Sequence, residues 1–168
     1  MTDPTRQVVP PEHWTWRDGA VEPGPAAVVD IDGVLSDAAN RQHYIEAPRR
    51  DWQSFFEACG DDEVIEEVKV LLDLLHPGLR IVLLTARPGR VHHLTEAWLN
   101  RYGIRWDLLI MRPWGDYDMA REFKQSSIWD LRRHGFDLRL GIEDDRRNVE
   151  MLRREGIPCI YIHSGYYD

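Results

Sequence analysis

The sequence predicts an α/β fold, a Rossmann-like three-layer sandwich built around a parallel sheet of five strands. Short, continuously apolar segments are typical of parallel strands that are covered on both faces. They alternate with longer segments whose apolar residues recur at helical spacing, and this alternation predicts right-handed crossovers in one parallel sheet. The chain has 168 residues, of which 43% are hydrophobic. That length is enough for one domain with a sizeable core.

The expected strands and helices follow each other along the chain in strict alternation. The strands are expected at 26–30 (AAVVD), 80–85 (RIVLLT), 107–111 (DLLIM), 138–143 (LRLGIE) and 158–162 (PCIYI). The helices are expected at 61–78, 91–103, 119–134 and 146–155. The first helix has acidic residues in its first turn and ends at Pro77-Gly78, as the helix dipole and the geometry of proline favour.

Two further segments complete the expected organisation. Residues 1–24 are rich in proline and polar residues, which is typical of an extended arm, and we expect Trp14 and Trp16 to anchor this arm to the body. Residues 25–168 form the domain itself. Within it, residues 37–60 lie between the first strand and the first long helix, so we expect a small cap-like insertion beside the carboxyl end of the sheet.

Composition restricts the class of protein. The formal net charge is -8, which argues against a protein that coats nucleic acid by charge alone, although a local basic groove stays possible. No apolar segment reaches the roughly 18 residues of a membrane span, and no signal peptide follows Met1. We therefore expect a cytoplasmic protein without a membrane partner; composition does not predict an oligomeric state.

Acidic residues follow two of the expected strands. Asp30 and Asp32 end the first strand, where residues i and i+2 share a face, and Gly33 allows a sharp turn after them. Asp144 and Asp145 end the fourth strand. Ligands of open α/β sheets bind at this edge, and clustered carboxylates require a cation. Hard oxygen ligands without His or Cys suit Mg²⁺, so these four aspartates are the predicted metal ligands.

A phosphate-binding site is predicted beside this cluster. Thr85 ends the second strand, Arg87 follows it, and Lys124 lies on the third helix. Bound Mg²⁺ prefers to share a substrate phosphate, and a hydroxyl, a lysine and an arginine complete such a site. Each feature alone has an ordinary structural explanation, such as a helix cap for an aspartate at the end of a strand. Their order at consecutive strand ends is what favours a phosphate-transferring site.

The same residues carry a resemblance to a known family. The segments DIDGVL, IVLLT and IEDD, together with Lys124, resemble the four motifs of the haloacid dehalogenase (HAD) superfamily. The segments TARP, GDYDMAREFK and LGIEDDRRNVEMLRREGIPCIYIHSG resemble the 3'-phosphatase domain of bacteriophage polynucleotide kinase/phosphatase. The resemblance spans residues 26–162. The P-loop motif of the kinase, GxxxxGK[ST], does not occur in this sequence, so the resemblance implies a phosphatase domain alone.

The resemblance implies a phosphatase that acts through an aspartyl-phosphate. Asp30 is the implied nucleophile, and Asp32 is the implied acid that protonates the leaving oxygen and then activates water. Thr85 is implied to hydrogen-bond the phosphoryl oxygens, and Lys124 is implied to neutralise charge on Asp30 and the phosphate.

The family's metal and substrate residues are implied in the same way. Mg²⁺ is implied to bind Asp30, the main-chain carbonyl of Asp32 and Asp144, with Asp145 holding a metal-bound water or orienting the other ligands. Arg87 and Arg41 match arginines that are expected to hold the substrate phosphate. For Arg41 a surface salt bridge is the competing interpretation.

The resemblance favours a polynucleotide 3'-phosphate as the substrate, with a nucleotide or another small phosphomonoester as the alternative. The aromatic residues Tyr44, Trp52, Phe55 and Trp114 either stack on a base or simply pack in the core. Two non-enzymatic alternatives stay open. A receiver-like signalling module is disfavoured because its acid pair comes first in the chain, and a catalytically silent Mg²⁺-binding scaffold is disfavoured because Asp30, Asp32 and Lys124 are all present.

Overall fold

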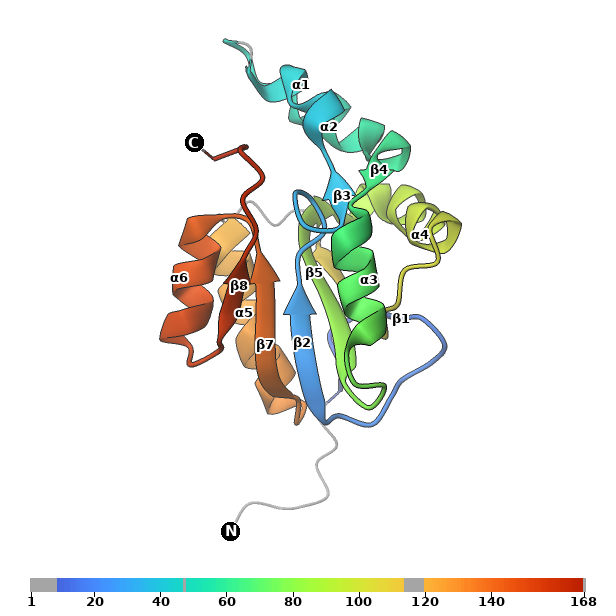
Figure 1. The fold of residues 1–168 in the computed structure, drawn as a ribbon, viewed down its shortest axis with the longest axis vertical. Helices are drawn as coiled ribbons and strands as arrows, with labels where there is room; N and C mark the ends of the chain where they lie inside the picture. The colour runs from blue at the N-terminus through green and yellow to red at the C-terminus, as the bar shows by residue number, and fades with distance from the viewer. Residues whose placement is uncertain (1–8, 47, 114–119, 168) are drawn as a thin grey trace.

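The computed structural model describes residues 9–46, 48–113 and 120–167. Its centre is a six-stranded sheet with the strand order β1-β6-β5-β2-β7-β8 (Figure 1). Five of the strands are parallel, as expected: β2 (Pro25–Val29), β5 (Arg80–Pro88), β6 (Leu108–Arg112), β7 (Asp137–Glu143) and β8 (Cys159–Tyr161). The α/β class and the parallel sheet are therefore confirmed.

The sixth strand, β1 (Trp14–Trp16), comes from the N-terminal arm and pairs antiparallel with β6. Trp14 is buried and its ring lies 4.8 Å from the ring of His134 and 6.2 Å from that of Phe136. The expected anchoring by tryptophan is present, but it includes strand pairing, which the proline-rich composition of the arm did not indicate.

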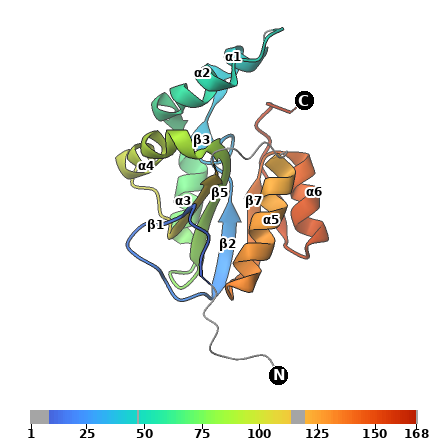
Figure 2. The ribbon, with the colours of Figure 1, turned by 180° about the vertical axis from the view of Figure 1, so that it is seen from behind.

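Helices cover both faces of the sheet and form the outer layers. α3 (Glu66–Leu74) and α4 (His92–Arg101) lie on one side, and α5 (Ala120–Arg133) and α6 (Arg146–Arg154) lie on the other (Figures 1 and 2). Alternate residues of each strand enter the two cores: Ala27 and Val29 face α3 and α4, whereas Ala26 and Val28 face α5 and α6. Among the described helices, none combines the length and the apolar character needed to cross a bilayer.

The expected first helix begins later than the sequence pattern suggested. Residues 63–64 form a short strand, β4 (Glu63–Val64), which pairs with β3 (Ser36–Asp37). The N–H of Ile65 donates to the carbonyl of Leu35 at 2.7 Å, which keeps this segment extended. The apolar spacing of Val64 and Ile65 fits a helix, but tertiary pairing with β3 decides the conformation. The third helix was expected from Met119, which lies outside the described residues, and its described part begins at Ala120.

A small insertion rises from the β3–β4 ribbon above the carboxyl edge of the sheet (Figure 1). It contains η1 (Ala39–Arg41), α1 (His43–Glu46), α2 (Trp52–Glu57) and η2 (Ala58–Asp61). The carboxylate of Asp51 caps α2 by accepting from the N–H of Ser54 at 2.9 Å. The insertion is short, so it matches the expected minimal cap of the fold class.

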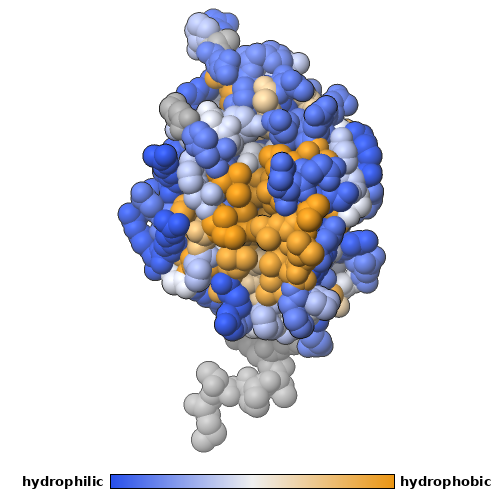
Figure 3. Space-filling model, in the orientation of Figure 1, coloured by the Kyte–Doolittle hydropathy of each residue, from blue (hydrophilic) through white to orange (hydrophobic). Residues whose placement is uncertain are grey.

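The side of the sheet that carries α3 also has an apolar surface. Figure 3 shows an apolar patch in the middle of this face. Exposed apolar side chains of the structure include Leu74 of α3 and Ile160 of β8. The edge of the sheet beyond β7 is therefore less completely covered on this side than on the side of α5 and α6, where β8 contacts α6.

Candidate active site

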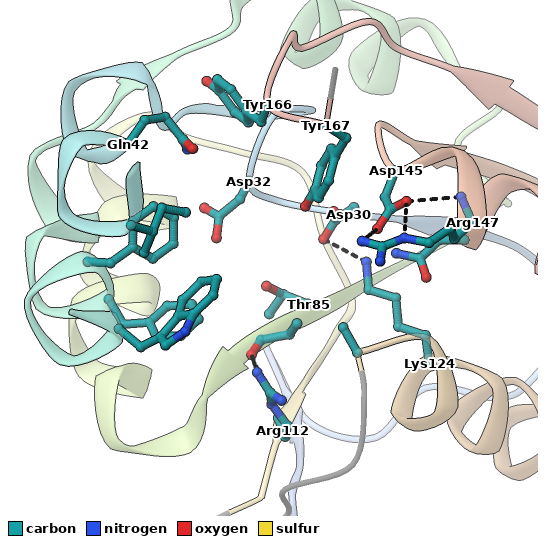
Figure 4. Close-up of a pocket in the computed structure, with 17 residues that line it drawn as sticks. Asp30, Asp32, Gln42, Thr85, Arg112, Lys124, Asp145, Arg147, Tyr166 and Tyr167 are labelled. Atoms are coloured by element: carbon teal, nitrogen blue, oxygen red, sulfur yellow. Dashed lines mark hydrogen bonds and ion pairs between the residues drawn. The ribbon is translucent and has the colours of Figure 1, made fainter. Parts of the chain in front are cut away.

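The carboxyl ends of β2 and β5 meet α5 and the start of α6 around one pocket of about 210 Å³ (Figure 4). Five predicted site residues line this pocket: Asp30, Asp32, Thr85, Lys124 and Asp145. Three other predicted residues, Arg41, Arg87 and Asp144, are buried next to it. The expectation that these side chains gather at one edge of the sheet agrees with the structure.

Lys124 bridges two carboxylates in the floor of the pocket. Its Nζ lies 3.0 Å from Oδ1 of Asp30 and 2.6 Å from Oε2 of Glu143. Burial raises the pKa of Asp30 well above its ordinary value, Glu143 raises it further, and Lys124 opposes both. Burial alone would lower the pKa of Lys124, but the two carboxylates outweigh it and raise that pKa, so the ammonium stays charged beside Asp30.

Glu143 was not among the predicted site residues. It ends β7 and is 2% exposed, and its carboxylate also accepts from the N–H groups of Asp144 and Asp145 at 3.1 and 3.3 Å. It therefore fixes both Lys124 and the loop that carries the last two aspartates. The signal was present in the sequence, since an acid that ends an apolar strand must have a buried partner.

Three carboxylates lie close enough together to hold a cation. Oxygen atoms of Asp30, Glu143 and Asp144 lie within 4.8 Å of one another. Both carboxylate oxygens of Asp144 are buried, and neither has a well-formed hydrogen bond within the described residues, although the nearby Ser164 lowers the pKa of this carboxyl group. Burial raises the pKa of Asp144 to about 7, and the neighbouring Asp30 contributes to this shift. An unpaired buried carboxylate is costly, and a bound cation removes that cost.

Gly33 makes this arrangement sterically possible. Its φ is +79°, and a Cβ atom at this position would lie 2.0 Å from Oδ2 of Asp144. The glycine therefore serves two needs at once, a left-handed turn after Asp32 and space for the Asp144 carboxylate. Its placement after the two acids follows directly from the packing of the two strand ends.

Asp145 has the contacts of a helix cap. Its Oδ1 accepts from the N–H of Arg147 at 2.9 Å, which caps α6, and its Oδ2 lies 2.8 Å from the Arg147 guanidinium. The carboxylate also lines the pocket. The expected contribution of Asp145 to a metal site stays a prediction.

Two buried arginines donate hydrogen bonds to Asp32. Oδ1 of Asp32 accepts from the terminal nitrogen of Arg41 at 2.5 Å, and from Nε and the terminal nitrogen of Arg87 at 3.0 and 2.6 Å. Burial alone would raise the pKa of Asp32, but Arg87 and Arg41 outweigh it and lower that pKa to about 2. Asp32 is therefore a carboxylate at neutral pH.

A second acid, the buried Asp62, completes this cluster. It accepts from Nε and the terminal nitrogen of Arg41 at 2.9 and 2.8 Å, from Arg87 at 3.4 Å, and from the hydroxyl of Ser36. No sequence pattern singled out Asp62, because the pair at 61–62 resembles the acidic first turn of a helix.

The burial of the two arginines decides one of the open interpretations. Arg41 is 1% exposed and Arg87 is fully buried, so a surface salt bridge is excluded for Arg41. Neither arginine is among the residues that line the pocket. The expectation that they hold substrate phosphate stays a prediction. In the structure both arginines bind the two aspartates; Arg41 also donates to the carbonyl of Phe55, and Arg87 also donates to the hydroxyls of Thr95 and Ser36.

Aromatic side chains from two separate segments line the pocket. Trp52, Phe55 and Phe56 of α2 form one wall, and the rings of Trp52 and Phe56 stack with centroids 6.0 Å apart. Tyr166 and Tyr167, which follow β8, form a second wall, and Thr85 also lines the pocket (Figure 4). Among the four aromatic candidates from the sequence, Trp52 and Phe55 line the pocket, Tyr44 packs against the core, and Trp114 lies outside the described residues.

Comparison with known proteins gives one family and one fold. The model of the family described as the polynucleotide kinase PNKP phosphatase domain matches residues 24–167. A chain in a solved Pnkp1/Rnl/Hen1 complex is similar, with a TM-score of 0.71 and 25% identity; the match covers 88% of this chain and 48% of that one. A chain in a solved Pnkp1/Rnl/Hen1 RNA repair complex has a TM-score of 0.69 and 24% identity; the match covers 88% of this chain and 45% of that one.

A more distant structure shares the fold alone. The haloacid dehalogenase-like hydrolase of Streptococcus pneumoniae has a TM-score of 0.54 and 12% identity, and the match covers 82% of this chain and 83% of that one. By contrast, this chain spans about half the length of the two Pnkp1 chains.

Proposed function

This chain belongs to the family of polynucleotide kinase PNKP phosphatase domains, and on that basis we propose that it is a Mg²⁺-dependent phosphomonoester hydrolase with Asp30 as its nucleophile. The observation that carries the proposal is the position of Asp30. Its carboxylate lies 3.0 Å from the Lys124 ammonium and next to the buried carboxylate of Asp144. A nucleophile with a fixed cation on one side and a cation site on the other is suited to attack a dianionic phosphate.

The proposed reaction has two steps. An oxygen of Asp30 attacks phosphorus, the bond from phosphorus to the leaving oxygen breaks, and the leaving oxygen receives a proton from Asp32. Water then attacks the phosphorus of the aspartyl-phosphate, gives a proton to Asp32, and releases inorganic phosphate and free Asp30. Thr85 donates its hydroxyl hydrogen to a phosphoryl oxygen, and Lys124 offsets the charge on the phosphoryl group.

Arg41 and Arg87 lower the pKa of Asp32 and so affect its proposed proton transfers. Because Arg41 and Arg87 keep Asp32 ionised, the side chain is ready to accept a proton from the attacking water. The first step needs Asp32 in its protonated form, so proton uptake must accompany substrate binding. We propose that the two arginines also fix the direction of the Asp32 carboxylate toward the pocket.

The donor set of the site suits Mg²⁺. Asp30 and Asp144 would hold the ion, together with the main-chain carbonyl of Asp32, and Asp145 would support the set. When bound, Mg²⁺ offsets the negative charge of the carboxylates and of the phosphoryl group.

We propose a polynucleotide 3'-phosphate end as the substrate. The family match, the similarity to chains of an RNA repair complex and the aromatic walls above the carboxylates support this choice. A polynucleotide end has a planar base beside the scissile phosphate, and aromatic side chains bind such bases without sequence preference. A nucleotidase or another small-molecule phosphatase is the alternative. The proposal implies a cytoplasmic protein whose partner is a kinase or ligase that acts on the same ends.

The test measures phosphate release from three substrates, with Mg²⁺ and with EDTA. The substrates are an aryl phosphate, a 3'-mononucleotide and an oligonucleotide that ends in a 3'-phosphate. Asp30→Asn must abolish release, whereas Asp73→Asn, a change of an exposed acid on α3, must leave it intact. A preference for the oligonucleotide supports end repair, and a preference for the mononucleotide supports the alternative. Release that survives Asp30→Asn contradicts the mechanism.

A further inference from the structure

The residues after β8 supply part of the lining of the pocket. The N–H of Ile162 donates to the carbonyl of Glu143 at 2.9 Å, so the chain continues along β7 to the site. Ser164 then packs over the turn of Gly33, with its Cβ 3.0 Å from the position of a Cβ at residue 33. Gly165, with a φ of +81°, turns the chain so that Tyr166 and Tyr167 enter the pocket wall (Figure 4).

Specific contacts hold this segment in place. The hydroxyl of Tyr166 donates to Oδ1 of Asp37 at 2.8 Å, which ties the segment to the base of the insertion. The guanidinium of Arg147 lies 5.9 Å from the ring centre of Tyr167, and Asp145 holds that guanidinium at 2.8 Å. The Tyr167 ring is thus supported on one side by a fixed cation.

Core packing does not explain the position of Tyr167. The ring belongs to neither of the two hydrophobic clusters that fill the domain, and the residue is 54% exposed although it lines the pocket. Figure 4 shows its hydroxyl end directed toward Asp30. A ring that is supported from behind, open to the pocket and directed at the reacting carboxylate has a face available for a ligand.

We propose that Tyr167 is a substrate-binding residue whose ring packs against the nucleoside that carries the scissile phosphate. The aromatic side chains of α2 line the same pocket and offer the nucleoside a second aromatic surface while its phosphate reaches Asp30. This inference rests on the proposed function and names the part of the substrate that the C-terminal segment recognises, which is a planar base or its ribose.

The test compares Tyr167→Ala and Tyr167→Phe with the wild-type chain. Base–aromatic stacking contributes about 1–3 kcal/mol, which is roughly a 5- to 150-fold change in binding. We expect Tyr167→Ala to raise KM for a 3'-mononucleotide or a 3'-phosphorylated oligonucleotide about tenfold or more. The KM for glycerol phosphate, which has no planar group, should rise far less, so the ratio of the two values changes. Tyr167→Phe keeps the ring and should behave like the wild type.

Trp129→Ala is the matched control, because Trp129 is 51% exposed on α5 and does not line the pocket. It should leave both KM values unchanged. An equal rise for nucleotide and glycerol phosphate, or no rise at all, would overturn the proposal. A Tyr167→Phe variant as weak as Tyr167→Ala would also overturn it, since the hydroxyl rather than the ring would then matter.

A binding measurement separates failure of this inference from failure of the proposed function. Calorimetric titration of Asp30→Asn with a 3'-mononucleotide needs no turnover. If binding occurs and weakens about tenfold in the Asp30→Asn/Tyr167→Ala double variant, the ring contact is supported even where hydrolysis fails. If Tyr167→Ala leaves the dissociation constant unchanged, or if no nucleotide binds to Asp30→Asn, the ring contact is refuted whether or not the phosphatase activity is found.

Discussion

Replacing Asp62 by asparagine tests the buried charge cluster under the active site. Asp62 and Asp32 together balance the guanidiniums of Arg41 and Arg87, and Asp62 and both arginines are at most 2% exposed. Asparagine has nearly the same shape as aspartate. It removes one negative charge from the cluster and leaves two buried cations facing one carboxylate.

The expected cost follows from the contacts of the Asp62 carboxylate. It accepts three hydrogen bonds from Arg41, at 2.8, 2.9 and 3.1 Å, and a longer one from Arg87 at 3.4 Å. A hydrogen bond to a charged group contributes about 1.5–3 kcal/mol, and an amide keeps only one acceptor oxygen. The loss of about two such bonds predicts a decrease of about 3–5 kcal/mol in the free energy of unfolding, the range found when a buried ion pair loses one partner.

Chemical denaturation in urea at neutral pH measures this decrease. The matched control is Asp61→Asn, which makes the same chemical change at the preceding, exposed residue and should cost less than about 0.5 kcal/mol. If both variants unfold at the same urea concentration, the buried cluster does not contribute as its geometry implies, and the argument that Asp62 holds the two arginines is refuted.

Three further predictions concern the site itself. Gly33→Ala forces a left-handed backbone on alanine and a clash with Asp144, so we expect calorimetry to show loss of Mg²⁺ binding and a lower melting temperature. The control is Gly19→Ala, which is also at positive φ but has no close neighbours, and it should keep full Mg²⁺ binding. Mg²⁺ must displace the proton of Asp144, whose pKa is about 7, so its affinity should rise steeply from pH 6 to 8; a flat profile would contradict this. The pKa of Asp32 is about 2, against an unperturbed 3.8, so its carboxylate should contribute about 2 kcal/mol to the free energy of unfolding above pH 4. This contribution is lost as the pH falls toward 2. In Asp32→Asn the free energy of unfolding should therefore depend less on pH in that range.

The sequence was informative wherever a residue is placed by its own strand or helix. Asp30, Asp32 and Thr85 follow apolar strands, and the parallel sheet brings these strand ends together, so the residues could be predicted without knowledge of any contact. The same reasoning placed Lys124 opposite them, because its helix connects two of the strands.

Residues placed by tertiary contacts were not predictable in this way. Asp62 belongs to the site because β4 pairs with β3, and local spacing had suggested a helix over that segment. Tyr166 and Tyr167 reach the pocket because the chain turns at Gly165 after the last strand, and nothing in the dipeptide itself indicates a pocket wall. The antiparallel strand of the arm was missed for the same reason, since its partner is almost one hundred residues away.

The two ends of the described chain lie at opposite ends of the sheet, and this matters for anyone who attaches something to the protein. The carbonyl of Val9 contacts His134 at 3.2 Å, near the turn where β7 begins, whereas Tyr167 lies at the rim of the pocket. An affinity tag or fluorescent protein attached next to Tyr167 would therefore start beside the pocket and could obstruct it or pull Tyr167 away. A fusion on the Val9 side starts from the opposite end of the sheet, so assays of activity and binding should be made with that version.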